Sequence, residues 1–370
     1  MQFIDLKRQY SRIENEIQAG FKQICESAQF IMGADVYRLE EMLANYVGRK
    51  FCLSCSSGTD ALLIPLMAWG IGKGDAVFTT PFTFVATSEV VVLTGATPIF
   101  VDIDKKTYNI SPSELEMVIA KVISEGKLKP KAIIPVDLFG LPANYDEINR
   151  IAKKYNLLVL EDAAQGFGGL YKGKKACSFG EVAATSFFPA KPLGCYGDGG
   201  AVFTDDEKLF EIFKSIRIHG QGSDKYDNIR TGINGRLDTL QALVLIEKLK
   251  IFDDELERRN KVAKKYNELL SGKLELPFVP EGYVSSWAQY SVLAKSSKHR
   301  LEIQENLKKN DIPTAIYYPI PLHLQTAYKE LGYKAGDMPI SEDIASRIFS
   351  LPMHPYLTDE EIEYICSKIN

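Results

Sequence analysis

Short apolar segments alternate with amphipathic segments through the first 160 residues, and this alternation constrains the fold more than any other feature of the chain. Parallel strands joined by crossover helices are buried on both faces, so the alternation predicts a mostly parallel sheet with helices on both sides. We expect strands at 50–54, 75–79, 97–102, 131–137 and 157–161, and intervening helices at 59–69, 84–94, 112–123 and 144–155. Two more strands are expected within 182–204, and the expected fold class is α/β.

A helical arm precedes the expected sheet, and a smaller domain follows it. The arm has helices at 13–27 and 36–46, and one long helix at 238–270 is expected to link the two domains. After it we expect strands near 287–294 and 313–318 and helices near 299–309, 340–349 and 358–368, which make a small α+β domain. The predicted division gives a large domain at 1–240, and the linking helix with the small domain at 241–370.

The composition excludes several functional classes. With 45% hydrophobic and 25% charged residues, the chain is expected to fold into globular domains. A formal net charge of -4 without a block of lysine or arginine argues against a nucleic-acid partner, which needs a basic surface. No apolar run reaches the ~18 residues of a membrane helix, and the start lacks the apolar core of a signal peptide. We therefore expect a cytoplasmic protein without a membrane partner.

The cysteines do not predict a metal site. Cys52 and Cys55 form a CxxC pair in an expected strand, but no second pair and no paired histidines complete a tetrahedral shell. Six cysteines in 370 residues also do not make a disulfide scaffold. We therefore expect no bound metal ion.

Lys191 is the strongest candidate for a reactive side chain. It lies between an apolar strand at 182–188 and a glycine-rich exit at 194–200. Tight backbone packing with little water disfavours the charged ammonium, so we expect a lowered pKa and a neutral amine that can condense with an aldehyde. The alternative is a solvated lysine in a surface turn, which is the usual position of a lysine.

Asp162 follows four apolar residues at 157–160 and Glu161, as expected at the carboxyl edge of a buried parallel strand. Ligands bind at that edge in α/β proteins. An aspartate held there needs a positive partner, and the ring nitrogen of pyridoxal 5'-phosphate (PLP) would supply one. Glu161 and Asp162 could instead form an ordinary cap between strand and helix.

Two further segments suit the same cofactor. Gly58 and Thr59 start a helix after a short strand, so free backbone N–H groups and the helix dipole could bind a phosphate, and Ser186 offers a hydroxyl just before Lys191. Phe84 lies in the next turn between strand and helix, where it could stack on a planar ring. Alternatively, the first segment is only a helix cap and Phe84 is a core residue.

Five segments in a fixed order carry a resemblance that covers the chain from Phe3 to Tyr356. They are SGTDA, PFTFVAT, EDAAQ, SFFPAKPLGCYGDGG and NGRLDTLQA. The chain resembles the PLP-dependent nucleotide-sugar aminotransferases of the DegT/DnrJ/EryC1/StrS family. The resemblance implies an aspartate aminotransferase-like fold, PLP transferase type I.

The resemblance also implies residue roles. Lys191 would bond to the cofactor and then move a proton, and Asp162 would keep the ring nitrogen protonated. The other implied cofactor contacts are Gln165 at the ring or its hydroxyl, Phe84 on the ring face, Gly58, Thr59 and Ser186 at the phosphate, and Asn234 from the neighbouring subunit. A homodimer with shared active sites is therefore implied.

The implied reaction moves an amino group from glutamate to a nucleotide sugar. The segments FIDLKRQY, HGQ, YPIPLH and SLPMHPYL are most similar to family members that aminate carbon 3 of UDP-2-acetamido-2-deoxy-3-oxo-glucuronate, a sugar of O-antigen biosynthesis. Arg230 and Arg236 are candidate carboxylate clamps for these anionic substrates. Tyr317, Tyr318 and His323 are candidates for the sugar pocket, although relatives often carry histidine where this chain has Tyr317.

Three alternatives remain open from the sequence. The sugar could carry dTDP or UDP, and the ketone could be at carbon 3 or at carbon 4 of a 6-deoxy sugar. A PLP-dependent sugar dehydratase is a second alternative, but family members with that activity carry histidine in place of the lysine. A non-catalytic regulator is the third, and the presence of Lys191, Asp162, Gln165 and Ser186 argues against it.

Overall fold

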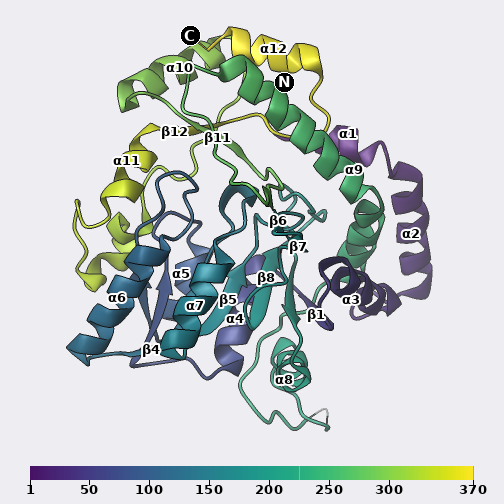
Figure 1. Cartoon of the computed structure of the whole chain (residues 1–370). Coiled ribbons are helices and arrows are strands. Elements are labelled where there is room, and N and C mark those ends of the chain that lie inside the picture. The colour runs from purple at the N-terminus through teal and green to yellow at the C-terminus, as the bar shows by residue number, and fades with distance from the viewer. Residues whose placement is uncertain (225, 370) are drawn as a thin grey trace.

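A seven-stranded sheet forms the centre of the molecule. The computed structural model describes residues 1–224 and 226–369. The strands run in the order β1 (Phe51–Cys55), β9 (Gly200–Thr204), β8 (Val182–Ser186), β5 (Leu158–Asp162), β4 (Lys129–Ile134), β2 (Asp75–Thr79) and β3 (Thr97–Phe100) (Figure 1). Every pairing from β8 to β3 is parallel, whereas β9 is antiparallel to both neighbours. The prediction of a mostly parallel sheet is confirmed.

Helices cover both faces of this sheet. One face packs against α4 (Gly58–Ala68), α5 (Ala86–Leu93) and α8 (Glu207–Arg217), and the other against α6 (Pro112–Glu125) and α7 (Tyr145–Tyr155). Side chains alternate between the two cores along each strand: Ile134 of β4 packs on the α4 side, and Ile133 packs on the α7 side. Both faces are therefore buried, as a parallel sheet requires.

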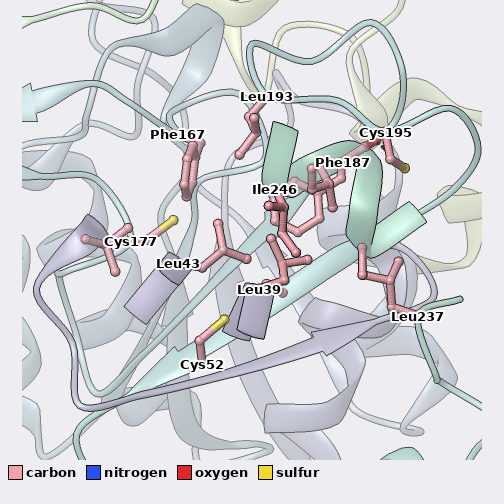
Figure 2. Packing of buried hydrophobic residues seen from close by; sticks show 14 of the residues in the cluster. Leu39, Leu43, Cys52, Phe167, Cys177, Phe187, Leu193, Cys195, Leu237 and Ile246 are labelled. Atoms are coloured by element: carbon pink, nitrogen blue, oxygen red, sulfur yellow. Dashed lines mark hydrogen bonds between the residues drawn. The ribbon is translucent and has the colours of Figure 1, made fainter. Parts of the chain in front are cut away.

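The N-terminal arm packs against the edge of the sheet and the long helix. It comprises α1 (Leu6–Tyr10), α2 (Glu14–Ser27) and α3 (Ala34–Val47), and α2 and α3 contact α9 (Thr239–Leu270) (Figure 1). Figure 2 shows Leu39 and Leu43 of α3 with Ile246 of α9 beside Phe187 and Leu193, which border the lysine loop. The arm and α9 thus enclose the loop that carries Lys191.

The small domain follows α9. Strands β11 (Tyr290–Leu293) and β12 (Ile348–Leu351) pair antiparallel. They share a core with the second half of α9, α10 (Ser297–Lys309) and α12 (Asp359–Ser367). The remaining elements of the whole described chain lie outside these groups. They are a three-stranded sheet of β10 (Tyr283–Val284), β6 (Leu170–Tyr171) and β7 (Lys174–Lys175), helix α11 (Pro339–Arg347), and the 3-10 helices η1 (Leu138–Gly140), η2 (Leu322–Leu324) and η3 (Thr326–Leu331).

The predicted division at residues 240 and 241 falls at the start of α9. The first half of α9 packs into the core that holds Phe187, and its second half packs into the small domain. The domain boundary therefore stays a prediction. In the residues that the structure describes, no helix is both long and apolar enough to cross a membrane.

Some elements differ from the predictions. Residues 313–318 form no named strand but a single bridge from Ala315 to Ser350, because Pro313 and Pro319 bracket the segment and lack the N–H of a ladder. The helix expected at 340–349 ends at Arg347, and the buried run that follows is strand β12. Helix α8, capped by Asp206, was not predicted.

Candidate active site

Several predicted site residues lie at the carboxyl ends of neighbouring sheet strands. Gly58 and Thr59 follow β1, Phe84 follows β2, Asp162 ends β5 and Ser186 ends β8. Carboxyl ends of parallel strands meet at one edge of a sheet, where α/β proteins bind ligands. The sheet therefore brings together side chains that are far apart in the sequence.

Asp162 is held at the end of β5 with only 3% of its surface exposed. Thr87 Oγ1 donates to its Oδ2 at 2.7 Å, and the backbone N–H of Ala164 donates to its Oδ1 at 3.2 Å. Burial raises the pKa of Asp162, while these two hydrogen bonds and the nearby Lys191 ammonium lower it. These hydrogen bonds fix the carboxylate in place. Its oxygens can still accept a further hydrogen bond from a positively charged partner.

Lys191 lies in the loop between β8 and β9. Its side chain is partly exposed, and in the described residues no hydrogen bond to its Nζ is recorded. Burial of the amine lowers the pKa of Lys191, and the negative charge of Asp162 opposes this shift. A lowered pKa close to the charge of Asp162 is what a reactive amine requires, and the catalytic role of Lys191 stays a prediction.

A phosphate could bind where α4 begins. Ser57 caps this helix by accepting from the N–H of Asp60 at 3.1 Å, and no partner is recorded in the described chain for the N–H groups of Gly58 and Thr59. A Cβ on Gly58 would lie 2.6 Å from Cβ of Ser186, so only glycine lets the helix start approach the end of β8 this closely. Free N–H groups, the helix dipole and hydroxyls meet there, which fits a phosphate.

Gln165 connects this site to the small domain. Its Oε1 accepts from the N–H of Phe139 at 2.6 Å, and its Nε2 donates to the hydroxyl of Tyr318 at 2.9 Å. Burial raises the pKa of Tyr318, so its hydroxyl stays protonated. Gln165 and Tyr318, which come from two segments 153 residues apart, therefore form one side of the site.

Phe84 and Thr87 come from the turn and first residues of α5. Phe84 is 56% exposed, so its ring is free to contact a ligand rather than being a core residue. Thr87, which is buried, makes the hydrogen bond that orients Asp162. No role was predicted for Thr87, and the available signal was its hydroxyl four residues after Thr83, whose hydroxyl it contacts at 3.1 Å.

The segment with Asn234 lies beside the phosphate loop of its own chain. The N–H of Ser56 donates to the carbonyl of Gly235 at 3.1 Å, while Asn234 is exposed and pairs with Ile218 in an isolated bridge. Arg236 is partly buried, and its Nε has no recorded hydrogen-bond partner in the described residues. The contribution of Asn234 to a neighbouring subunit stays a prediction.

Arg230 is placed differently from Arg236. It lines an apolar groove of about 600 Å³ together with residues of α4, α5 and α8, among them Met67, Leu93 and Ile212. The structure therefore does not bring Arg230 to Lys191 within the described chain.

The three residues predicted for the sugar pocket, Tyr317, Tyr318 and His323, lie in different surroundings. Tyr317 is half-buried and its ring lies 6.4 Å from that of Phe3, whereas Tyr318 reaches Gln165. His323 is 1% exposed, and its Nε2 lies 3.1 Å from Glu342. The ring is buried and its Nε2 is occupied by Glu342, while Nδ1 has no recorded partner in the described residues, so the predicted contact of His323 with a sugar stays a prediction.

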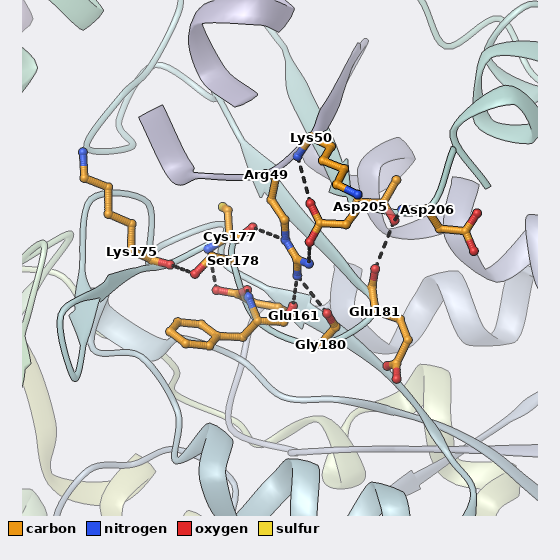
Figure 3. Close-up of polar contacts among 12 residues, drawn as sticks. Arg49, Lys50, Glu161, Lys175, Cys177, Ser178, Gly180, Glu181, Asp205 and Asp206 are labelled. Atoms are coloured by element: carbon orange, nitrogen blue, oxygen red, sulfur yellow. Dashed lines mark hydrogen bonds and ion pairs between the residues drawn. The ribbon is translucent and has the colours of Figure 1, made fainter. Parts of the chain in front are cut away.

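Two further carboxyl groups are buried behind Asp162. Asp137 accepts from the hydroxyl of Tyr145 at 2.7 Å and from the N–H of Ala143 at 3.0 Å, and its Oδ2 has no recorded partner in the described chain. Glu161 accepts from the N–H of Cys177 (Figure 3). It also accepts from the N–H of Phe179. Burial and the neighbouring carboxylate raise the pKa of Glu161, and burial raises that of Asp137 to about 7.

We expect Asp137 to make stability depend on pH. An unfolded aspartate has a pKa of about 4, so between pH ~4 and pH ~7 the folded protein holds a proton that the unfolded chain releases. The stabilisation that this proton gives the folded protein has its full value below pH ~4 and is lost as the pH rises through ~7. The difference in unfolding free energy between Asp137→Asn and wild type should therefore change by about 2 kcal/mol in favour of the variant from about pH 5 to pH 7. Urea unfolding at each pH measures this difference. A difference that does not change with pH would contradict this assignment.

Comparison with known proteins assigns the family. The profile of the DegT/DnrJ/EryC1/StrS aminotransferase family matches residues 11–370. The chain belongs to this family. UDP-2-acetamido-2-deoxy-3-oxo-D-glucuronate aminotransferase from Pseudomonas aeruginosa is 47% identical to it over 370 residues, which cover 100% of this chain and 99% of that protein.

Solved structures agree with this assignment. The crystal structure of a DegT DnrJ EryC1 StrS aminotransferase from Brucella abortus is 50% identical, with a TM-score of 0.97 and coverage of 100% of this chain and 98% of that one. NtdA from Bacillus subtilis with its bound cofactor pyridoxamine phosphate (PMP) is 27% identical, with a TM-score of 0.86 and coverage of 99% and 83%. The predictions of a PLP-dependent sugar aminotransferase and of PLP fold type I are confirmed.

Proposed function

We propose that this aminotransferase moves the amino group of glutamate to the C3 ketone of a UDP-linked 3-oxo sugar, UDP-2-acetamido-2-deoxy-3-oxo-glucuronate, in O-antigen biosynthesis in the cytoplasm. The observation that carries the proposal is the lysine with a lowered pKa beside buried Asp162, next to a helix start with free N–H groups. The Pseudomonas aeruginosa relative, named for this activity, supports the substrate over the full length of both chains.

The residues present fit PLP. Asp162 offers a buried carboxylate for the ring nitrogen, Phe84 an exposed ring for the ring face, and the start of α4 with Ser186 a cradle for the phosphate. When bound, PLP supplies an aldehyde that condenses with an amine with loss of water, and a ring that takes up electrons from a bond broken at the adjoining carbon.

Lys191 would then act twice. Its lowered pKa favours the neutral amine, which is the form that would act as the nucleophile, and the same amine would afterwards take up and return a proton at the donor's α-carbon. Asp162 would supply the negative charge that keeps the ring nitrogen protonated, and Thr87 and Ala164 hold Asp162 in place. Gln165, fixed by Phe139 and Tyr318, would lie against the ring edge.

Both substrates are anions, so they need cations within a chain of net charge -4. We propose Arg236, whose Nε has no recorded partner in the described chain, as a carboxylate clamp in the site. Arg230 would have to act on a neighbouring subunit, because it lies on the groove of α4, α5 and α8. Tyr317 and Tyr318 would contact the sugar from the small domain.

We also propose a homodimer with shared sites. Exposed apolar side chains gather on the same part of the large domain as the groove: Val92 and Leu93 of α5, 51% and 67% exposed, and Ile229 beside Arg230, 56% exposed. A second copy would remove this apolar surface from water. Asn234, which is exposed beside this surface, would then reach the partner's phosphate site.

The function is tested in two steps with purified protein and PLP. Glutamate alone should convert the bound cofactor to PMP and release one 2-oxoglutarate per site, followed by visible absorbance and product assay. The loaded protein should then aminate UDP-2-acetamido-2-deoxy-3-oxo-glucuronate faster than a 4-oxo UDP sugar or a 3-oxo dTDP sugar in the same panel. Failure of the first step with glutamate would refute amino transfer from this donor, and preference for another sugar would refute only the substrate.

A further inference from the structure

Lys248 of α9 is an almost fully buried lysine, with 1% of its surface exposed. Its Nζ donates to the carbonyl of Gly194 at 2.6 Å and lies 4.3 Å from the ring centroid of Tyr196. No carboxylate of the described residues lies within ion-pair distance of it. Lysines are almost never buried without such a partner, so this position needs an explanation other than stability.

The carbonyl that Lys248 binds belongs to the lysine loop. Gly194 lies three residues after Lys191. Seven residues before Lys248, on the same side of α9, Gln241 accepts from the N–H of Tyr196 at 2.9 Å. A Cβ on Gly197 would lie 3.1 Å from Gln241, so the loop is packed closely against the helix. Two polar side chains of α9 therefore hold the backbone that follows Lys191.

The other polar groups around Lys248 do not compete for its amine, which bonds to the carbonyl of Gly194. Burial lowers its pKa to about 8, and the charge of Glu255 opposes the shift. Glu255 is itself occupied by Gln9 at 2.8 Å and by the hydroxyl of Tyr356, and Cys195 Sγ is directed to the carbonyls of Phe187 and Gly197. Gly194 is thus the only hydrogen-bond acceptor recorded for Lys248 in the described residues.

Lys191, in contrast, has no recorded hydrogen bond at its Nζ among the described residues, so its position depends on the backbone of its loop. We propose that Lys248 is a positioning residue: by holding the carbonyl of Gly194 together with Gln241 at Tyr196, it fixes the loop so that the amine of Lys191 faces Asp162. This inference rests on the proposed role of Lys191 and adds the group that orients it.

The test compares two cofactor forms that differ only at the reacting carbon. PLP carries the aldehyde that bonds to Lys191, and PMP carries an amine there and forms no bond with Lys191. The ratio of the dissociation constants for PMP and PLP therefore measures how well Lys191 is placed, independently of the phosphate and ring contacts. Full-length protein is used, with Lys191→Ala to define the ratio when no bond forms.

We expect Lys248→Met to weaken PLP binding about tenfold and to leave PMP binding within about twofold of wild type, since misplacing a reacting group by ~1 Å is enough for such a loss. Gln241→Met, which removes the second contact, should shift the ratio in the same direction. The control is Lys250→Met, on the same helix, whose half-exposed side chain pairs only with Glu247 among the described residues and should not change the ratio.

An unchanged ratio in both Lys248→Met and Gln241→Met would overturn the inference. Equal weakening of PLP and PMP would also overturn it, because that result indicates a general structural role. If Lys248→Met does not fold, as its PMP binding and melting curve will show, Gln241→Met decides alone. Failure of the proposed function is distinguishable, because wild type and Lys191→Ala would then have the same ratio.

Discussion

Replacing Lys191 by alanine is expected to reduce amino transfer by about 10³- to 10⁴-fold or more, because the variant has neither the nucleophile nor the group that moves the proton. The fold should persist, since no recorded hydrogen bond among the described residues is lost with the amine. The phosphate cradle at Gly58 and Ser186 is also untouched. The measurements are the rates of the glutamate step and of the sugar step, together with the melting temperature.

The control for this variant is covalent trapping of the cofactor. Borohydride should attach PLP to Lys191 of the wild type and to no residue of Lys191→Ala, as peptide masses will show. PMP should still bind the variant. Cofactor fixed to the variant at another lysine, or a turnover within tenfold of wild type, would contradict the assignment.

Arg217→Met is expected to lower the free energy of unfolding by about 3 to 5 kcal/mol, because it leaves the charge of Glu40 buried without its partner. Arg217 pairs with Glu40 at 2.5 Å and donates to the carbonyl of Ser54 at 2.9 Å, with side chains 4% and 10% exposed. The same Glu40 oxygen accepts from the N–H and hydroxyl of Ser54, at 2.8 Å each. Urea unfolding measures the change.

The matched control is a surface ion pair. Arg150 pairs with Glu116 at 2.8 Å, but its side chain is 50% exposed, so Arg150→Met should cost less than about 1 kcal/mol. Adding Glu40→Gln to Arg217→Met should recover part of the loss, because the unpaired charge is then removed. Equal effects of Arg217→Met and Arg150→Met would mean that burial does not decide the strength of these pairs.

The sheet could be predicted from the sequence because each parallel strand is a short apolar run that is buried on both faces. Strand β2 was predicted at 75–79 and is observed at Asp75–Thr79, and β5 was predicted within one residue of Leu158–Asp162. Helix α8 was missed, and no element was predicted between the strand that ends at Thr204 and the long helix at 238–270. The first two residues of β12 were assigned to a helix, because a short apolar run has no clear period.

The central part of the site could be predicted for a related reason. Lys191, Asp162 and the start of α4 each adjoin a sheet strand, so the strand pattern alone brings them toward one edge. Thr87 and the link from Gln165 to Tyr318 could not be predicted, because they depend on how α5 and the small domain are placed in space. His323 was predicted from its neighbours in sequence, which do not reveal that Glu342 occupies it.

Helix α9 is unbroken from Thr239 to Leu270 and has no proline or glycine within it. Its first half bears Gln241 and Lys248 against the lysine loop, and its second half belongs to the core of the small domain. A helix of this length extends about 48 Å along its axis. The small domain, which bears Tyr317 and Tyr318, and the loop of Lys191 therefore share one continuous helix. A tilt of the small domain is expected to shift this helix and with it the loop that carries the reactive amine.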